Sequence, residues 1–176
     1  LFYGGNIGHA QNIYNLIKLA IKFKKQKNAH FLFVGDGDEV ELILKEKEIN
    51  DLDNVTYMSS VDKKTYEEML SSFDIGLFSL HPDHKTHNFP GKLLSYMSHS
   101  KPILGSCNNG NDLKEVINES KSGFIFFNGD DENLYNSCKL LIDSFKLRKE
   151  MGLNSNKLLR EKFSVKTAAS QIERFF

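Results

Sequence analysis

The sequence predicts a three-layer α/β domain, in which a doubly wound parallel sheet is covered by helices on both faces. Three observations lead to this fold class. Short apolar runs alternate with stretches of helical periodicity, as in successive strand–helix units. Glycine-rich turns follow several of the apolar runs, and the runs themselves are as short as typical strands. The 176 residues suffice for one domain with a sizeable core.

The first half of the chain is expected to open with the end of a strand at residues 1–3, followed by the turn "GGNIGHAQ". A helix comes next, because Ile13, Leu16, Ile17, Ala20 and Ile21 recur at the 3.6-residue spacing of one helix face. Further strands are predicted at "HFLFV", "NVTYM" and "DIGLFSL", with helices at residues 40–47 and 64–73.

The second half begins with a polar, irregular stretch at residues 80–88. The expected order is then a helix from about Pro90, the strand "KPILG", the loop "SCNNGND", a helix to Glu119, the strand "GFIFF" and helices over residues 131–176. Doubly wound sheets bind ligands beyond the carboxyl ends of their strands. The glycine-rich turns at residues 4–8, 35–37 and 105–110 all fall there, so the candidate site is expected along one edge of the sheet.

Charge and cysteine content narrow the classes of partner. Lysine plus arginine equals aspartate plus glutamate at 23 each, so no global field attracts nucleic acid, and any anion must be held locally. The basic run at residues 22–27 is interpreted as the solvated end of a helix.

Cys107 and Cys138 form no CxxC pair and are expected to be free thiols in a reducing compartment. No apolar run approaches the ~20 residues that cross a bilayer.

The stretch "YGGNIG" can be interpreted in two ways. A dinucleotide-binding fingerprint needs GxGxxG, and Tyr3 stands where its first glycine would be. Asp36, at the end of the second strand, occupies the place of a ribose-binding acid and keeps an NAD(P)-binding domain open as an alternative. The favoured interpretation is a tight turn that points backbone amides at an anion near a helix start.

The helix near Pro90 indicates an anion site at its start. Proline is well tolerated there, and Gly91 lets a ligand approach the backbone. The amides of Gly91, Lys92 and Leu93 are expected to be free and to lie at the positive end of the helix dipole. Lys92 adds a full charge where helices prefer acids, and a bound anion would offset that cost.

The histidines His81, His84 and His87 are spaced like metal ligands. Pro82 argues against a helix that would align them, and the sequence has no second ligand cluster. No metal site is predicted, and the loop is expected to be solvated or to touch substrate.

Five segments in order resemble the C-terminal half of family-4 GT-B glycosyltransferases: "YGGNIGHAQN", "FLFVGDGDE", "SFDIGLFSL", "NFPGKLLSYMSHSKPILG" and "SGFIFFNGDDENLY". The segment "HNFPGKLLSYM" most resembles bacterial transferases that add N-acetyl-L-fucosamine in O-antigen and capsule synthesis. The resemblance implies that residues 1–176 are a Rossmann-like, nucleotide-sugar (donor) binding domain. It also implies that the N-terminal acceptor domain is absent from this chain, and that the chain alone is inactive.

By motif position, the resemblance assigns roles to individual residues. The donor diphosphate would contact Gly5, Asn6, Gly8, Gly91, Lys92 and Leu93. The nucleoside would contact Gly35, Ser60, Val61 and Ser95. Lys92 and His87 would be catalytic, with Lys92 stabilising the charge that develops on the leaving diphosphate.

The sequence also departs from the family pattern. The family has two glutamates eight positions apart, where this chain has His87 and Ser95, and its usual arginine in the first turn is Asn6. Ser95 can bond a ribose hydroxyl without charge assistance, and His87 can donate to a phosphate or a sugar hydroxyl. A non-catalytic, nucleotide-binding regulatory module therefore stays open as an alternative.

The resemblance implies transfer of a sugar, N-acetyl-L-fucosamine among the candidates, from a UDP-sugar to a lipid-linked oligosaccharide in bacterial surface polysaccharide synthesis. Such an enzyme retains anomeric configuration and needs no metal cofactor. The expected partners are the UDP-sugar and the lipid-linked acceptor, which binds through the other half. We expect a cytoplasmic location, with the full-length enzyme peripherally associated with the inner face of the plasma membrane.

Overall fold

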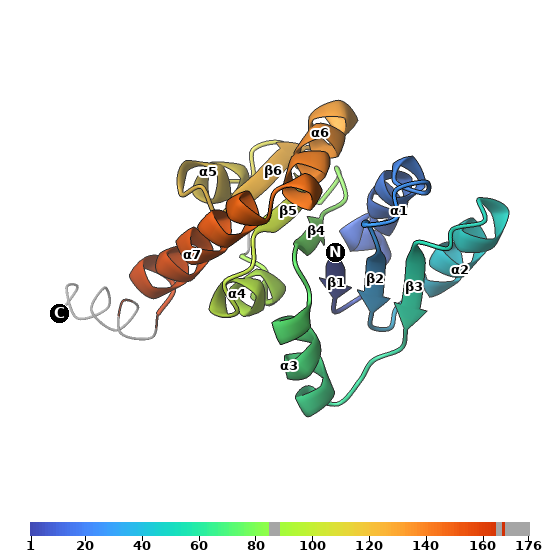
Figure 1. The fold of residues 1–176 in the computed structure, drawn as a ribbon, viewed down its shortest axis with the longest axis horizontal. Coiled ribbons are helices and arrows are strands. Elements are labelled where there is room, and N and C mark those ends of the chain that lie inside the picture. The colour runs from blue at the N-terminus through green and yellow to red at the C-terminus, as the bar shows by residue number, and fades with distance from the viewer. Residues whose placement is uncertain (85–88, 165–166, 168–176) are drawn as a thin grey trace.

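The computed structural model describes residues 1–84, 89–164 and 167, which form one six-stranded sheet with helices on both faces (Figure 1). All neighbouring strands are parallel, in the order β3-β2-β1-β4-β5-β6, so the predicted doubly wound fold is confirmed. The strands are β1 (Phe2–Gly4), β2 (Phe31–Val34), β3 (Val55–Met58), β4 (Gly76–Ser79), β5 (Ile103–Cys107) and β6 (Gly123–Phe127).

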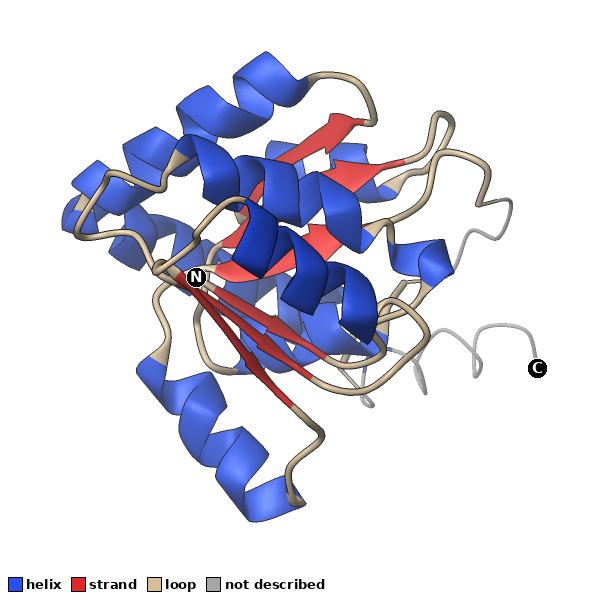
Figure 2. Cartoon of the chain, turned by 90° about the vertical axis from the view of Figure 1, so that its right-hand side faces the viewer, coloured by secondary structure: helices blue, strands red, loops and turns tan. Residues whose placement is uncertain are grey.

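The helices cover the sheet in two layers (Figure 2). They are the 3-10 helix η1 (His9–Gln11), α1 (Ile13–Lys22), α2 (Val40–Ile49), α3 (Lys63–Ser72), α4 (Gly91–Ser98), α5 (Leu113–Glu119), α6 (Asp131–Asp143) and α7 (Phe145–Lys162). Successive strand residues point to opposite faces, so Tyr3 joins one buried cluster and Phe2 the other. The cluster with Tyr3 lies under α1, α2 and α6, and the cluster with Phe2 lies under α3, α4 and α5. Helix α7 contributes Met151 to the first cluster and Leu158 to the second.

Strand β5 is longer than the sequence predicted. Ser106 pairs with Phe126 and Cys107 with Phe127, so the strand continues into the expected loop. The prediction that Gly105 begins a glycine turn is therefore wrong. Gly105 lies within the sheet, where an added Cβ would come within 1.8 Å of the Phe78 carbonyl oxygen.

Two helices also differ slightly from the prediction: α2 extends to Ile49, and α3 spans Lys63–Ser72. Helix α4 begins at Gly91, with Pro90 as its N-cap in an extended conformation, in agreement with the start expected near Pro90. The expected C-terminal helices are present as α6 and α7, which ends at Lys162. None of the helices in the described part of the chain combines the length and the apolar character needed to cross a bilayer.

Candidate anion site at the carboxyl edge of the sheet

The turns that follow β1 and β2 pack against each other through their backbones. The Gly5 N–H donates to the Val34 carbonyl and the Ile7 N–H to the Asp36 carbonyl, both at 2.9 Å. Gly35 has a φ of 145°, and an added Cβ there would lie 1.9 Å from the Gly5 carbonyl oxygen. At Gly37 an added Cβ would lie 2.1 Å from the Ile7 carbonyl oxygen. Glycine is therefore required in the second turn so that the first can lie on it.

This pairing changes which amides of the first turn can face a ligand. The amides of Gly5 and Ile7 are already bonded, contrary to the expectation that the whole turn points its amides at an anion. The N–H groups of Asn6 and Gly8 make no hydrogen bond with the described residues. The Asn6 side-chain amide donates to Gln11 at 2.9 Å, which holds the turn against η1.

The start of α4 presents two further amides. The N–H groups of Gly91 and Lys92 make no hydrogen bond with the described residues, and an added Cβ at Gly91 would meet nothing within 4 Å. The expectation of a free amide at Leu93 is wrong, because its N–H donates to the Pro90 carbonyl at 3.0 Å. The Leu93 side chain is fully buried in the core. As far as the described residues go, this helix start therefore has two amides without a partner and open space at Gly91.

Lys92 is the only cation among the described residues whose buried nitrogen has no hydrogen-bond partner. Its Nζ lies 3.7 Å from the centroid of the Tyr3 ring, and its Cε would be 3.5 Å from a Cβ added at Gly5. Burial lowers the pKa of Lys92 to about 7. A buried, unpaired ammonium is costly unless a counter-ion joins it. Lys92 thus lies between α4 and the first turn, where an anion would find a charge and free amides together.

The predicted nucleoside contacts Gly35, Ser60 and Val61 lie together beyond β2 and β3. The Gly35 N–H donates to the Met58 carbonyl at 3.0 Å, and Asp36 accepts from the Ser60 N–H at 3.2 Å. Ser60 is exposed and Val61 is half-buried. Their roles stay predictions, but the structure brings the three residues to one place.

The sequence was expected to carry no acidic D-x-D pair at this edge, and this expectation is wrong, because Asp36 and Asp38 have that spacing directly after β2. Both carboxylate oxygens of Asp36 have partners, Ser60 N–H and the Tyr57 hydroxyl at 3.5 Å. Within the described residues, no group of three or more His, Cys, Asp or Glu side chains could hold a metal ion.

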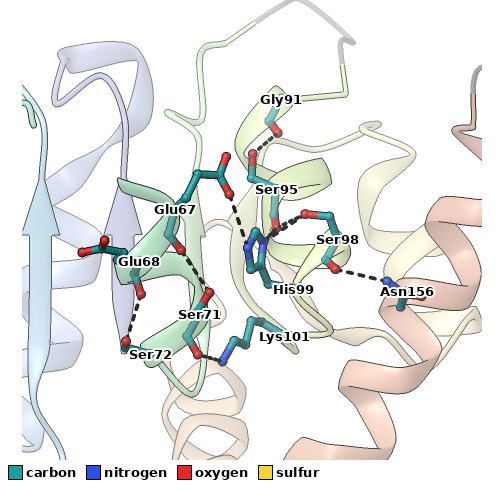
Figure 3. Close-up of polar contacts among 10 residues, drawn as sticks. All are labelled: Glu67, Glu68, Ser71, Ser72, Gly91, Ser95, Ser98, His99, Lys101 and Asn156. Carbon is teal, nitrogen blue, oxygen red and sulfur yellow. Dashed lines mark hydrogen bonds and ion pairs between the residues drawn. The ribbon is translucent and has the colours of Figure 1, made fainter. Parts of the chain in front are cut away.

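Ser95 lies one turn into α4, and its hydroxyl is 3.5 Å from the Gly91 carbonyl oxygen (Figure 3). The end of the same helix is tied to α3, because His99 Nε2 lies 3.4 Å from a carboxylate oxygen of Glu67. It is tied to α7 as well, since the Asn156 amide donates to the Ser98 carbonyl at 3.2 Å. These contacts hold α4, and with it the helix start that carries Lys92, in one orientation.

The roles predicted for the three loop histidines, His81, His84 and His87, stay predictions. His87, the second predicted catalytic residue, lies outside the described residues. The rings of His81 and His9 have centroids 4.4 Å apart and are tilted by 36° to each other. The backbone carbonyl of His84 accepts from Asn108 at 2.7 Å.

Two tyrosines belong to the site although sequence reasoning did not include them. Tyr3 was considered only as a break in a glycine fingerprint, yet its ring faces Lys92 and its hydroxyl donates to the Asn6 carbonyl at 2.6 Å. The buried Tyr96 hydroxyl accepts from the Gly4 N–H at 3.1 Å. The helical i, i+4 spacing of Lys92 and Tyr96 was a signal that both side chains reach the same neighbour.

The chain is thus a Rossmann-like domain with a cationic, amide-rich site at the carboxyl edge of its sheet. Residues 1–144 match the family model described as "Glycosyl transferases group 1", and the chain belongs to that family. It is 28% identical over 120 residues to "Probable glycosyltransferase WbjE" of Pseudomonas aeruginosa. That alignment covers 68% of this chain and 30% of WbjE, so the chain spans less than a third of that relative.

Solved structures show the same fold at low sequence identity. A mutant of S. aureus TarM in complex with UDP matches with a TM-score of 0.82 and 18% identity, over 98% of this chain and 34% of TarM. Anabaena HepE in complex with UDP-glucose matches at 0.78 and 16%, over 99% of this chain and 48% of HepE. The C-terminal domain of LpcC from Francisella tularensis matches at 0.74 and 16%, over 93% of this chain and 87% of that domain. These matches confirm the fold expected of a GT-B glycosyltransferase.

Proposed function

We propose that this chain is the donor-binding half of a retaining glycosyltransferase that uses a UDP-sugar without a metal ion. The observation that carries the proposal is the buried ammonium of Lys92, which makes no hydrogen bond with the described residues, and neither do the amides of Gly91, Lys92, Asn6 and Gly8. A diphosphate supplies the two things this arrangement lacks, a counter-charge and hydrogen-bond acceptors. The UDP and UDP-glucose complexes of TarM and HepE support this choice of ligand.

In the proposed reaction, the bond between the sugar and the β-phosphate breaks and negative charge builds up on the departing UDP. The Lys92 ammonium and the two amides belong to the start of the same helix, α4, and they would stabilise that charge together. Gly35, Ser60 and Val61 would contact the nucleoside, Ser95 a ribose hydroxyl, and His87 a phosphate or sugar hydroxyl. Asn6, in place of the family arginine, would contribute through its backbone amide.

We further propose N-acetyl-L-fucosamine as the transferred sugar and a lipid-linked oligosaccharide as the acceptor. The resemblance of the segment "HNFPGKLLSYM" to N-acetyl-L-fucosamine transferases supports this choice of sugar. One structural neighbour, WaaG, is described as a glycosyltransferase involved in lipopolysaccharide biosynthesis, with a TM-score of 0.72. The acceptor would bind through a further half of the full-length enzyme, in the cytoplasm at the inner face of the plasma membrane, and this chain alone would transfer no sugar.

Calorimetric titration of UDP, uridine and NAD⁺ in the presence of EDTA tests the proposal. We expect UDP to bind under these conditions and NAD⁺ not to bind. Binding that vanishes with EDTA would instead place a metal on carboxylates such as Asp36 and Asp38. Binding of NAD⁺ in place of UDP would make the chain a dinucleotide-binding domain.

The absence of both family glutamates supports a second candidate function, a nucleotide-binding regulatory module without catalysis. The two functions differ only in turnover. Sugar transfer by the full-length protein, with UDP-N-acetyl-L-fucosamine and a lipid-linked acceptor, distinguishes them. UDP binding without transfer by that protein would favour the regulatory module.

A further inference from the structure

Tyr3 contacts both elements of the candidate diphosphate site. It is the middle residue of β1 and is fully buried. The face of its ring lies 3.7 Å from Lys92 Nζ at the start of α4. Its hydroxyl donates to the carbonyl of Asn6 in the first turn at 2.6 Å. One side chain therefore bridges the lysine and the turn.

The chemistry of Tyr3 suits this position because it attracts a cation without neutralising it. Burial raises the pKa of the Tyr3 hydroxyl well above its ordinary value, so the side chain stays neutral and its hydroxyl remains a donor to Asn6. The ring face attracts the ammonium through its quadrupole. A carboxylate at the same place would form an ion pair with Lys92 and compete with an incoming anion. The ring accepts no conventional hydrogen bond from Lys92, whose buried Nζ has no hydrogen-bond partner among the described residues.

The other polar groups near Tyr3 are already engaged elsewhere. Glu39 is the acid that acts on Tyr3 from the start of α2, and its carboxylate is engaged by the Ile13 N–H at 3.3 Å and by His9 at 3.4 Å. Tyr96, one turn after Lys92 on α4, has its hydroxyl bonded to the Gly4 N–H. Helix α4 is thus fastened to β1 at two adjacent points, of which only Tyr3 contacts the ammonium.

We propose that Tyr3 is a positioning residue for diphosphate binding. Its ring holds the Lys92 ammonium over Gly5, and its hydroxyl fixes the position of the neighbouring turn relative to that ammonium. This inference rests on the proposed function, because it concerns the same site. Tyr3 would therefore raise the affinity of the site for phosphate through Lys92, without contacting the ligand itself.

Two Tyr3 variants separate the two contacts. Tyr3→Phe keeps the ring and loses only the bond to Asn6, whereas Tyr3→Leu loses the ring as well. We expect Tyr3→Leu to weaken UDP about tenfold while uridine binding changes less than about twofold, since only the phosphate contacts depend on Lys92. Tyr3→Phe should retain most of the UDP affinity, which would show that the ring carries the larger effect.

The controls exclude a general loss of structure. Phe33→Leu removes a fully buried aromatic whose ring centroid is 6.0 Å from that of Tyr3, whereas the ring over which Lys92 lies is that of Tyr3. It should lower the melting temperature, as Tyr3→Leu does, and leave the ratio of UDP to uridine affinity unchanged. In a Lys92→Met background, Tyr3→Leu should weaken UDP no further, because both changes remove the same contact.

Three results would overturn the inference. The first is equal weakening of UDP and uridine by Tyr3→Leu, and the second is a loss that persists in the Lys92→Met background. The third is unchanged UDP affinity in a folded Tyr3→Leu protein. If the unaltered chain binds no UDP, the proposed function itself falls, and the role given to Tyr3 falls with it.

Discussion

The hydroxyl of Tyr96 accepts a hydrogen bond from the Gly4 N–H at 3.1 Å, across 92 positions of sequence. Gly4 ends β1 at the carboxyl edge, where the ladder of the sheet no longer supplies an acceptor for this amide. A side chain of α4 therefore completes the hydrogen bonding of the central strand. The same contact places the start of α4 directly above the first turn.

Replacing Tyr96 by Phe should destabilise the fold, because it leaves the buried Gly4 N–H without an acceptor. We expect a loss of about 1–3 kcal/mol in the free energy of unfolding, measured by urea denaturation. Tyr14→Phe is the matched control, since Tyr14 is 43% exposed and its hydroxyl has no partner among the described residues. A loss no larger than that of the control would contradict the structural role of the Tyr96 hydroxyl.

Gly35→Ala should be far more destabilising than Gly129→Ala. Both glycines have a positive φ, 145° and 98°, but only Gly35 has a backbone atom where the methyl group would go. Backbone strain alone should cost about 1 kcal/mol at Gly129, while the collision with Gly5 should raise the cost at Gly35 to about 3 kcal/mol or more. Urea denaturation of both variants checks this, and equal losses would show that the two turns separate easily.

Lys92→Met should weaken UDP about ten- to a hundredfold and leave uridine nearly unaffected, because it removes one charge-assisted contact to phosphate. Methionine keeps an unbranched side chain against Tyr3. Lys22→Met is the control, since Lys22 also lies over a tyrosine ring, that of Tyr135 at 5.4 Å, but at the far end of α1. Calorimetric titration of each variant with both ligands measures the effect. Similar weakening of UDP and uridine would mean that Lys92 acts through folding or the nucleoside.

UDP binding should weaken as the pH rises above about 7, because burial lowers the pKa of Lys92 to about 7 in the free protein. A bound diphosphate favours the ammonium, so the pKa of Lys92 must be higher in the complex. Between those two pKa values the complex holds one more proton than the free protein, and affinity falls by up to about tenfold per pH unit.

Proton uptake can be measured directly by titrating UDP in two buffers that differ in ionisation enthalpy. We expect net uptake near pH 8 in the unaltered chain and none in Lys92→Met. An affinity that is flat over this pH range in both proteins would show that Lys92 is already fully charged before UDP binds.

Both cysteines should be unreactive in the folded chain. They are free and buried, and burial raises the pKa of Cys107 to about 11 and that of Cys138 to about 12. Very little thiolate therefore exists at mildly alkaline pH, and access is blocked as well. Ellman's reagent should label neither cysteine in native buffer and both in urea. Rapid labelling of the native chain would show that the carboxyl end of β5 or helix α6 opens readily.

The sequence by itself determined the order and type of the main elements and the edge of the sheet at which the candidate site was expected. Each of these depends on neighbours in the chain: the 3.6-residue spacing in α1, the short buried run of β2, and the topological rule for parallel sheets. Lys92 could be predicted for the same reason, because a proline, a glycine and a lysine at one helix start are a local signal.

Only the tertiary structure decided which backbone amides of the candidate site are bonded within the described residues and which are not. The Gly5 amide is bonded to β2, and the glycine at position 35 serves the approach of another turn. Whether Tyr3 faces Lys92 depends on how α4 docks on β1. Such contacts join residues distant in the sequence, and their geometry follows from packing of the whole sheet and its helices, which no local pattern encodes.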